Sequence, residues 1–363
     1  MKRICFVDFD MSITGGVEAV TSSLTNALVD RYEIFVCAIL QTKDKIAYDL
    51  DERIHYTKML TCENRLRIMK KECRKKFIEY VKSNKIDIVV MMGNYPAFIV
   101  SGTRFSTKAK YIYCDHGGLM NQWHQKDITF IRFYDAIMSH KVITLTDKTR
   151  QDYIDRFHLR SGKVQRIYNW IDDKVLEEKK EYNQKSTHIL TVGRCGKEKG
   201  YDMLVEIAKR VMPQHPSWEW HIYGEGEVFE EVKESIKEAN LENQLILKGN
   251  LIDAYQVYHQ YSFLVMTSYR EGLPIVLLEA DALGIPMISF DIETGPNEII
   301  QDGFNGYLVK PFEIDEMTLK INEMIENVEK RKELSNNTTE TLGKFKKENI
   351  LEQWQKLFEG LVK

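Results

Sequence analysis

The sequence lacks a long apolar run, and it lacks cysteines spaced for a metal or redox site. No stretch approaches the roughly 18 apolar residues that a membrane-spanning helix needs. Asp8 and Asp10 interrupt the short apolar segment at the N-terminus, and no small-residue cleavage site follows it. None of the six cysteines forms a C-x-x-C pair, which argues against zinc and thiol–disulfide motifs. We therefore expect a cytoplasmic protein in a reducing compartment, with Cys5, Cys37 and Cys114 as buried free thiols.

What is present is the composition of a globular protein, with 43% hydrophobic and 29% charged residues and no low-complexity tract. A length of 363 residues is too great for one ordinary core and suits two domains. The charge is unevenly distributed. Residues 1–170 contain 28 basic and 19 acidic residues, a net charge of +9, whereas the remainder contains 23 and 35, a net charge of −12. We expect the first half to face an anionic partner.

Short β-branched runs alternate with amphipathic segments along both halves of the chain, which predicts parallel, doubly wound sheets. Strands are predicted at 3–9, 33–40, 86–92, 110–114 and 141–146, and again at 188–193, 218–224, 245–249, 263–268 and 286–290. The predicted fold class is therefore α/β with two Rossmann-like domains. Their expected limits are 1–171 and 187–344, with a charged linker at 172–186 and a C-terminal helix at 345–363 that could pack back on the first domain.

Ligands of doubly wound sheets bind beyond the carboxyl ends of the strands, so the strand-to-helix loops should carry the chemistry. In the second domain, Gly193 ends a strand, and Arg194 and Lys199 lie in the short loop before the next helix. Two cations beside a helix N-terminus form an anion site, in which Arg grips phosphate oxygens in a bidentate manner and Lys acts as a point charge. A solvated basic loop is the alternative interpretation.

The segment SYREGLPIVLLEADALG reads as a strand end, a turn and an apolar helix. The turn is expected to offer the backbone N–H groups of Gly272 and Leu273 to a diphosphate or a sugar hydroxyl. Glu271 stands just before the helix, where its alternative role is to interact with the helix dipole. Glu279 stands inside the apolar helix, where a carboxylate is costly unless it meets a polar partner such as the diol of a ribose. The alternatives for Glu279 are a surface position or a buried pair with an arginine.

The first half offers weaker candidates. Gly16 lies between the first strand and the first helix, where glycine lets a substrate approach the backbone, but the pattern is not G-x-G-x-x-G and disfavours a nicotinamide cofactor. His116 follows a strand end and could donate a hydrogen bond to a sugar hydroxyl or lend charge to a phosphate, unless it is a surface-loop histidine. His124 has a weaker claim of the same kind. Two D-x-D segments are expected by chance among 54 acidic residues, so no metal is assigned.

Taken together, these segments resemble glycosyltransferase family 4, whose members have the GT-B architecture of two Rossmann-like domains facing each other across a cleft. The resemblance covers nearly the whole chain and is carried, in order, by VGR…EKG, YGEG, LKGN, EGLPIVLLE and TGPNEII…NGYLV. It implies a retaining enzyme that moves a hexose or N-acetylhexosamine from a nucleotide sugar, by family habit UDP-linked, to a glycan or lipid-linked glycan. It also implies bacterial surface-polysaccharide or glycolipid synthesis, no cofactor and no divalent metal.

The resemblance further implies roles for single residues. Arg194 and Lys199 would hold the donor diphosphate and stabilise the negative charge that builds on the departing nucleotide. Glu271 would lie near the donor sugar hydroxyls, and Glu279 would bind the ribose. The remaining implied contacts are the backbone of Gly193, Gly249, Asn250, Gly272 and Leu273 with the donor, Gly16 with its phosphates, and His116 with the sugar.

The sequence departs from the family pattern at two positions. Trp170 stands where a glycine is common, and Asp281 occupies a position that is usually small or apolar. Neither removes the resemblance. Two other interpretations stay open: a sugar-nucleotide epimerase or hydrolase of the same fold, or a non-catalytic GT-B partner subunit. The second of these is disfavoured by the intact donor-site residues Arg194, Lys199, Glu271 and Glu279.

Residues 65–82 form the best basic amphipathic helix of the sequence. Its apolar stripe at helical spacing consists of Leu66, Met69, Cys73, Phe77 and Tyr80 or Val81. Such a helix could lie on the anionic inner face of a membrane, near a lipid-linked acceptor, or it could pack its stripe into the domain core and leave a solvated basic face. A nucleic-acid partner is not expected, because no stacking aromatic residues interleave the basic run.

Overall fold

The computed structural model describes residues 1–60 and 65–362, apart from the side chain of Leu66. The chain forms two compact units, one of Met1–Asn169 joined by the segment that starts at Glu348, and one of Trp170–Lys347. The C-terminal segment thus belongs to the first unit, and the charged stretch 172–186 belongs to the second. Cys62 lies outside the described residues. Within those residues, no helix is both long enough and apolar enough to cross a membrane.

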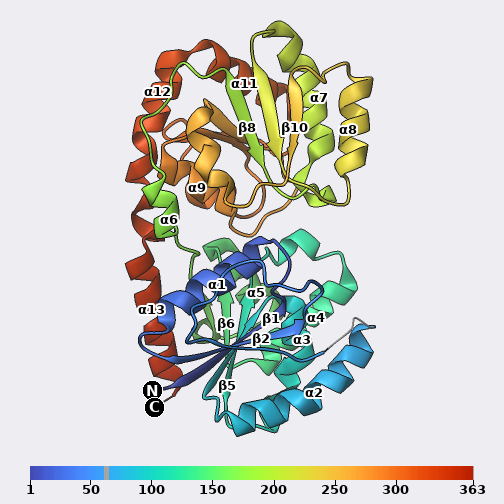
Figure 1. The fold of residues 1–363 in the computed structure, drawn as a ribbon, viewed down its shortest axis with the longest axis vertical. Coiled ribbons are helices and arrows are strands. Elements are labelled where there is room, and N and C mark those ends of the chain that lie inside the picture. The colour runs from blue at the N-terminus through green and yellow to red at the C-terminus, as the bar shows by residue number, and fades with distance from the viewer. Residues whose placement is uncertain (61–64, 363) are drawn as a thin grey trace. The chain divides into compact units, whose positions relative to one another are not determined.

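The first unit contains a seven-stranded parallel sheet in the order β3-β2-β1-β4-β5-β6-β7. Its strands are β1 (Arg3–Asp10), β2 (Glu33–Leu40), β3 (His55–Lys58), β4 (Ile88–Met92), β5 (Lys110–Asp115), β6 (Lys141–Thr144) and β7 (Val164–Arg166). The apolar runs of the central strands are buried because helices cover both faces of the sheet (Figure 1). Cys5, Cys37 and Cys114 are buried free thiols, as predicted.

The helices of this unit divide between the two faces of the sheet. They are α1 (Gly16–Leu28), α2 (Leu66–Ser83), α3 (Asn94–Val100), α4 (Lys126–Met138), α5 (Asp147–Phe157) and α13 (Lys347–Leu361). Helices α2, α3, α4 and α5 contribute to one apolar core. Helix α13 buries Trp354 and Phe358, and the Phe358 ring meets Tyr32 edge-to-face at 5.6 Å. The two termini lie together, where Lys2 Nζ donates to the carbonyl oxygen of Val362 at 2.9 Å (Figure 1).

The second unit contains a six-stranded parallel sheet in the order β10-β9-β8-β11-β12-β13. Its strands are β8 (His188–Val192), β9 (Glu219–Tyr223), β10 (Leu245–Gly249), β11 (Phe263–Met266), β12 (Met287–Phe290) and β13 (Gly306–Val309). Its helices are α6 (Asp173–Glu177), α7 (Tyr201–Val211), α8 (Phe229–Glu238), α9 (Ile275–Leu283), α10 (Pro296–Ile299), α11 (Ile314–Glu326) and α12 (Val328–Asn337). Helix α7 packs against α8 and α11 on one face, and α9 lies on the other (Figure 1). The predicted α/β class with two doubly wound parallel sheets is confirmed.

The strand order fixes where the loops of the second unit meet. The order reverses between β8 and β11, which are neighbours in the sheet although two strands separate them in sequence. Ligands of such sheets bind outside this switch point, because the two loops that follow these strands diverge to opposite faces. The loop after β8 and the loop after β11 are the two segments that the sequence singled out.

Asp281, the departure in α9, is buried but has polar partners. Asn305 Nδ2 donates to its Oδ1 at 2.8 Å, and the Thr341 hydroxyl donates to its Oδ2 at 2.5 Å. Burial raises the pKa of Asp281 to about 7, against the opposing effect of these two donors. A carboxyl group is therefore tolerated at this position because the surrounding loops supply its hydrogen bonds.

Gly200 allows the chain to turn from the β8 loop into α7, and its replacement is expected to be destabilising. Its φ is +65°, and a Cβ atom added there would lie 2.1 Å from the carbonyl oxygen of Thr267. We expect Gly200→Ala to lower the free energy of unfolding by at least about 2 kcal/mol, since the left-handed conformation alone costs an alanine about 1–2 kcal/mol. Urea denaturation measures this change. Gly343→Ala is the matched control, because no atom lies within 4 Å of its Cβ position; equal midpoints for both variants would contradict the prediction.

Candidate active site

The loops after β8 and β11 meet in an ion pair at the carboxyl edge of the second sheet. Lys199 Nζ donates to Glu271 Oε1 at 2.7 Å, and the Ser268 hydroxyl donates to the same oxygen at 2.7 Å. The Lys199 and Glu271 side chains are only 24% and 11% exposed, so water screens this pair much less than a surface pair. The structure thus brings together two of the residues that the sequence proposed for the donor site.

Hydrogen bonds to main-chain carbonyl oxygens hold the two loops in place. The Thr267 hydroxyl donates to the carbonyl oxygen of Lys199 at 3.1 Å, and the backbone N–H of Tyr269 donates to the carbonyl oxygen of Glu198 at 2.8 Å. The carbonyl oxygen of Glu271 accepts from the Thr294 hydroxyl. The ammonium and carboxylate groups are therefore positioned by the backbone on both sides of the switch point.

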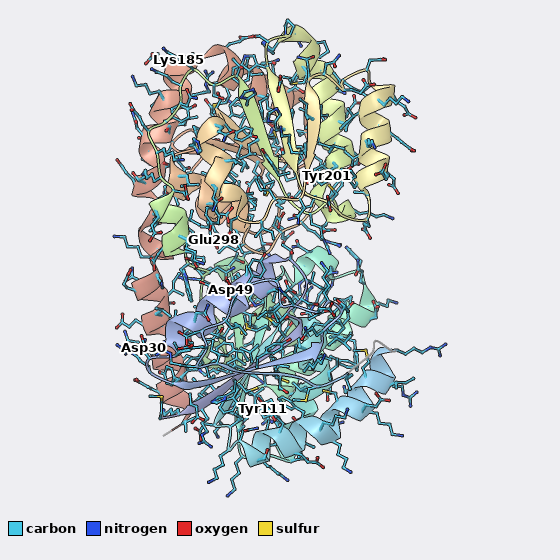
Figure 2. All side chains as sticks on the ribbon, viewed as in Figure 1. Asp30, Asp49, Tyr111, Lys185, Tyr201 and Glu298 are labelled. Atoms are coloured by element: carbon cyan, nitrogen blue, oxygen red, sulfur yellow. The ribbon has the colours of Figure 1, made fainter. Side chains whose placement is uncertain are left out.

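Gly193 lies where β8 ends, and the chain approaches it closely from two directions. Tyr201 is the first residue of α7 (Figure 2), and its hydroxyl donates to the Gly193 carbonyl oxygen at 2.6 Å. A Cβ atom at Gly224 would lie 1.9 Å from the same oxygen. Arg194 follows directly. Its side chain is 67% exposed, and its guanidinium donates to Glu198 Oε1 at 3.0 Å. The arginine end of this pair is open to water although Glu198 is only 20% exposed, so a phosphate can reach Arg194 and compete with Glu198 for it.

Glu279 lies in α9, as the sequence indicated, and one buried tyrosine contacts it. The Tyr258 hydroxyl donates to Glu279 Oε2 at 2.9 Å. Burial raises the pKa of Glu279 to about 7, and the Tyr258 hydrogen bond opposes this rise. The hydrogen-bond partner of Glu279 is therefore a tyrosine rather than an arginine, and the residue is half-buried rather than at the surface.

The other predicted donor-side residues also follow strand ends of the second sheet. Gly249 ends β10 with a φ of +72°, and its carbonyl oxygen accepts from the backbone N–H of Gly224 at 2.8 Å. Asn250 is exposed beside it. Gly272 and Leu273 form the turn before α9, in which the Leu273 side chain is buried. The turn and the helix start match the sequence interpretation of this segment.

In the first unit, Gly16 begins α1 and His116 follows β5 directly. The Nε2 atom of His116 is buried without a hydrogen-bond partner. Burial lowers the pKa of His116 to about 4, despite the opposing charge of Asp115. The ring is therefore neutral at pH 7 in the empty site, which suits the first of its two predicted roles, the donation of a hydrogen bond.

Sequence reasoning missed the charged network beneath His116. Asp115 Oδ2 lies 3.3 Å from Arg132 Nε and accepts from the Tyr153 hydroxyl at 2.7 Å, and its Oδ1 accepts from the backbone N–H of Gly117 at 2.9 Å. The aspartate and arginine are almost fully buried. Such a network fixes the start of the loop that carries His116. The sequence offered one signal for this network: Asp115 is a charged residue at the end of the apolar run YIYCD.

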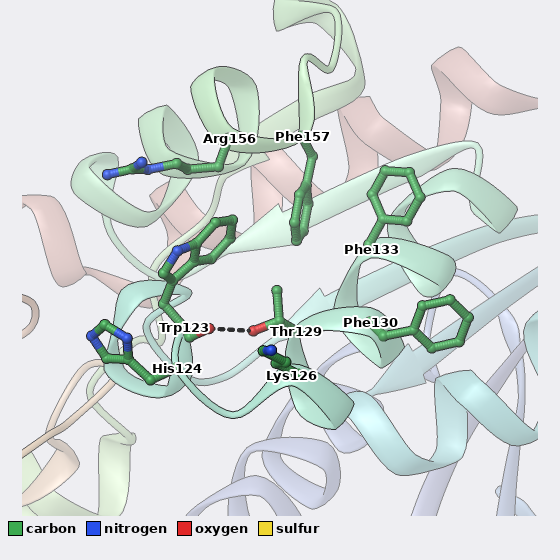
Figure 3. Close-up of a pocket in the computed structure, with 8 residues that line it drawn as sticks. All are labelled: Trp123, His124, Lys126, Thr129, Phe130, Phe133, Arg156 and Phe157. Carbon is green, nitrogen blue, oxygen red and sulfur yellow. Dashed lines mark hydrogen bonds between the residues drawn. The ribbon is translucent and has the colours of Figure 1, made fainter.

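A pocket opens beside α4 in the first unit. It is lined by Trp123, His124, Lys126, Thr129, Phe130, Phe133, Arg156 and Phe157 (Figure 3). Two of the lining residues are joined by a hydrogen bond, in which the Thr129 hydroxyl donates to the carbonyl oxygen of Trp123 at 3.0 Å. The Arg156 guanidinium lies 5.4 Å from the centre of the Trp123 ring. The pocket therefore combines aromatic rings with positively charged groups. His124 lines this pocket, a location that the sequence did not predict.

The basic helix α2 directs its apolar stripe inward. Met69, Cys73, Phe77 and Val81 are buried in the core of the first unit. The side chain of Leu66 lies outside the described part of the chain. Several basic side chains of α2 remain exposed: Arg65, Arg67, Lys71, Lys75, Lys76 and Lys82. The apolar stripe of α2 is thus buried in the protein core and is not available for insertion into a lipid bilayer. Only the exposed basic side chains of the helix could contact an anionic surface.

Comparison with known proteins matches both halves of the chain. Residues 14–175 match the family model described as Glycosyltransferase Family 4, and residues 172–341 match Glycosyl transferases group 1. The chain is 24% identical to an uncharacterized glycosyltransferase of Haemophilus influenzae, over 98% of this chain and 99% of the relative. It is 26% identical to the amylovoran biosynthesis glycosyltransferase AmsD of Erwinia amylovora, over 97% and 98%.

A solved structure shows the same fold. The crystal structure of Anabaena HepE in complex with UDP and glucose superposes with a TM-score of 0.82 at 17% sequence identity, covering 99% of this chain and 100% of that chain. Two parallel-sheet Rossmann-like domains, each matched by a glycosyltransferase family model, account for nearly the whole sequence. The protein therefore belongs to the GT-B glycosyltransferases, with a family 4 domain followed by a group 1 domain.

Proposed function

We propose that this glycosyltransferase moves a hexose or N-acetylhexosamine from a UDP-sugar to a glycan or lipid-linked glycan, with retention of configuration and without a divalent metal. The observation that carries this proposal is the shielded Lys199–Glu271 pair at the switch point of the second sheet. AmsD, which is named for amylovoran biosynthesis, and HepE, which binds UDP and glucose, support the polysaccharide context and the UDP donor.

The chain offers positive charge where a leaving diphosphate would need it. Lys199 lies one residue before Gly200, the N-cap of α7, and Arg194 is exposed in the same loop. Cations and helix N-termini stabilise the charge that develops on a departing nucleotide, and charges positioned in advance lower the barrier most. Glu271 already accepts two hydrogen bonds on Oε1, one from an ammonium group, which makes it a poor nucleophile. We infer that Glu271 positions the donor and that the leaving phosphate takes the proton of the acceptor.

The test measures UDP release with and without an acceptor. Tag-free protein in EDTA is incubated with UDP-glucose, UDP-galactose, UDP-N-acetylglucosamine or UDP-N-acetylgalactosamine, each with and without a glycan acceptor. Release that requires acceptor, with an α-linked product by NMR, is the expected result. Equal release without acceptor would indicate hydrolysis, and an inverted product would refute retention. Loss of activity in EDTA would refute metal independence.

Glu279 gives a prediction about pH. In the folded protein Glu279 keeps its proton up to about pH 7, whereas in the unfolded chain it loses the proton above its ordinary pKa of 4.5. The contribution of Glu279 to the free energy of unfolding therefore falls as pH rises from about 4.5 to 7. The ionised form accepts ribose hydroxyls, so UDP affinity should rise up to about tenfold between pH 6 and pH 8. Calorimetry with UDP at several pH values measures this rise. In the Glu279→Gln variant this rise should disappear, and UDP affinity should change with pH only through the titration of the UDP phosphate. If the affinity of the variant and of the wild-type protein changed with pH in the same way, Glu279 would not have this role.

The acceptor side is proposed to lie on the first unit. The α4 pocket offers aromatic faces to sugar rings, and Lys126 and Arg156 offer cations to an anionic glycan or a lipid pyrophosphate. The exposed basic face of α2 would then hold the protein near an anionic membrane by charge alone. Co-sedimentation with vesicles tests this: binding should require anionic lipid and fall with salt, and binding that ignores both would refute it.

A further inference from the structure

Two histidines and a glutamate meet on one face of the second sheet, at the amino ends of its strands. His188 is the first residue of β8, and Glu219 is the first residue of β9, directly opposite it in register. His221 follows two residues later in β9 and therefore points to the same face as Glu219. The donor-site loops leave from the carboxyl ends of these strands, so this cluster lies at the opposite edge of the sheet.

The ligand atoms of the cluster converge. Glu219 Oε2 lies 2.8 Å from His221 Nε2 and 3.8 Å from His188 Nε2, and one such atom from each residue lies within 4.8 Å of the others. Ligands that bind a tetrahedral zinc ion at about 2.0–2.2 Å lie about 3.3 Å from each other. The two separations from Glu219 bracket that value, and the ligand atoms of the two histidines lie within 4.8 Å of each other. The His188 and His221 rings stack with centroids 4.9 Å apart, so at least one ring must rotate for both lone pairs to meet one ion.

His221 has a polar partner at each ring nitrogen. Its Nδ1 lies 3.0 Å from the hydroxyl oxygen of Tyr261, and that hydroxyl donates its own proton to Tyr223 at 3.1 Å. Its Nε2 lies within hydrogen-bond distance of Glu219 Oε2, at 2.8 Å. A bound cation would replace the proton that these two atoms share, and Nδ1 would keep its proton toward Tyr261.

We propose that His188, Glu219 and His221 bind a zinc-like divalent cation through two imidazole nitrogens and one carboxylate oxygen, with a fourth position open to water. This donor set suits zinc and its borderline neighbours and does not suit calcium or magnesium, which prefer oxygen ligands. The hydrogen bond from His221 to Tyr261 is the outer contact that orients metal-bound histidines. The His188 and Glu219 side chains are 39% and 42% exposed, which gives the ion a path from solvent.

The expected role of the ion is to stabilise the second unit. It would join the first residues of β8 and β9 and, through Tyr261, the segment that leads into β11. A cation that binds only the folded state raises the free energy of unfolding with its concentration. Because the site lies away from Lys199 and Glu271, removal of the ion should leave sugar transfer unchanged.

The experiment uses tag-free, full-length protein stripped with EDTA and titrated with Zn²⁺ by calorimetry, with Co²⁺ as a spectroscopic probe. We expect one equivalent to bind, with an absorption band of tetrahedral Co²⁺ and a higher melting temperature. His188→Ala and Glu219→Gln each remove an accessible ligand, and each should weaken binding at least about tenfold. His55→Ala is the matched control, because His55 faces a single glutamate, Glu33, across two strands of the first unit.

Each outcome decides the question. Absence of binding at millimolar Zn²⁺, or binding that both ligand variants leave unchanged, overturns the proposal. Loss of binding in these variants but not in His55→Ala supports it, and circular dichroism confirms that all variants are folded. UDP-sugar turnover is measured in parallel. If Zn²⁺ does not bind but turnover is normal, the metal proposal fails and the proposed transferase function stands. If Zn²⁺ binds as expected but no sugar is transferred, the transferase proposal fails and the metal proposal stands.

Discussion

Glu271→Ala is expected to lower kcat/KM for sugar transfer by at least about a hundredfold while the protein stays folded and still binds UDP. The carboxylate positions the Lys199 ammonium and is proposed to contact the donor sugar, so its loss removes interactions that matter in the transition state. Binding of UDP should not weaken, because Lys199 is released from its partner and becomes more available to the diphosphate. Initial rates and calorimetry with UDP separate the two effects.

The control for this variant is Glu242→Ala, which removes an exposed carboxylate from a loop of the same unit. It should leave both rate and UDP affinity unchanged. If Glu271→Ala instead lost UDP affinity in proportion to rate, Glu271 would be a ground-state binding residue rather than a positioning group. Wild-type turnover in Glu271→Ala would remove it from the site altogether.

The sequence predicted the central strands well and missed three edge strands, β3, β7 and β13, whereas the edge strand β10 was predicted at its observed bounds, 245–249. The buried runs at β1, β2, β4 and β5 are continuous in apolar residues, because helices cover both faces of a parallel sheet. Strand β3 (HYTK) forms an edge and contains no buried residue, so no apolar run marked it. The stretch around 172–186 looked like a linker because it is charged, yet its first residues form the short helix α6.

The candidate site shows a similar limit. The sequence could place Lys199 and Glu271 in strand-to-helix loops, and the strand order of a doubly wound sheet makes those loops neighbours. It could not find the Asp115–Arg132 pair or the His188–Glu219 contact, because each joins residues that are far apart in sequence and carry no motif. Such pairs emerge only when the register between strands or the packing of a helix is known. The cleft expected between the two domains stays a prediction.

Lys199→Ala is expected to lower kcat by about a hundredfold to a thousandfold, which corresponds to about 2.7–4 kcal/mol of lost transition-state stabilisation. The ammonium group lies at the switch point, is held by Glu271 and is only 24% exposed, so its charge acts with little screening. Unlike Glu271→Ala, this variant should also weaken UDP binding, and it should leave the binding of uridine nearly unchanged because the nucleoside carries no phosphate. Lys197→Ala is the matched control, since Lys197 lies two residues away in the same loop and is exposed.

The two variants together test whether the pair acts as a unit. Lys199 and Glu271 share a 2.7 Å hydrogen bond, so their effects on rate should not add. The double variant Lys199→Ala/Glu271→Ala should lose less rate than the two single losses combined, because the part of the Glu271 effect that comes from positioning Lys199 is already absent and only its proposed contact with the donor sugar remains to be lost. Additive losses in the double-mutant cycle would show that the two groups act on separate parts of the donor. In that case the ion pair would be a feature of the empty site, and the diphosphate would replace Glu271 as the partner of Lys199 when the donor binds.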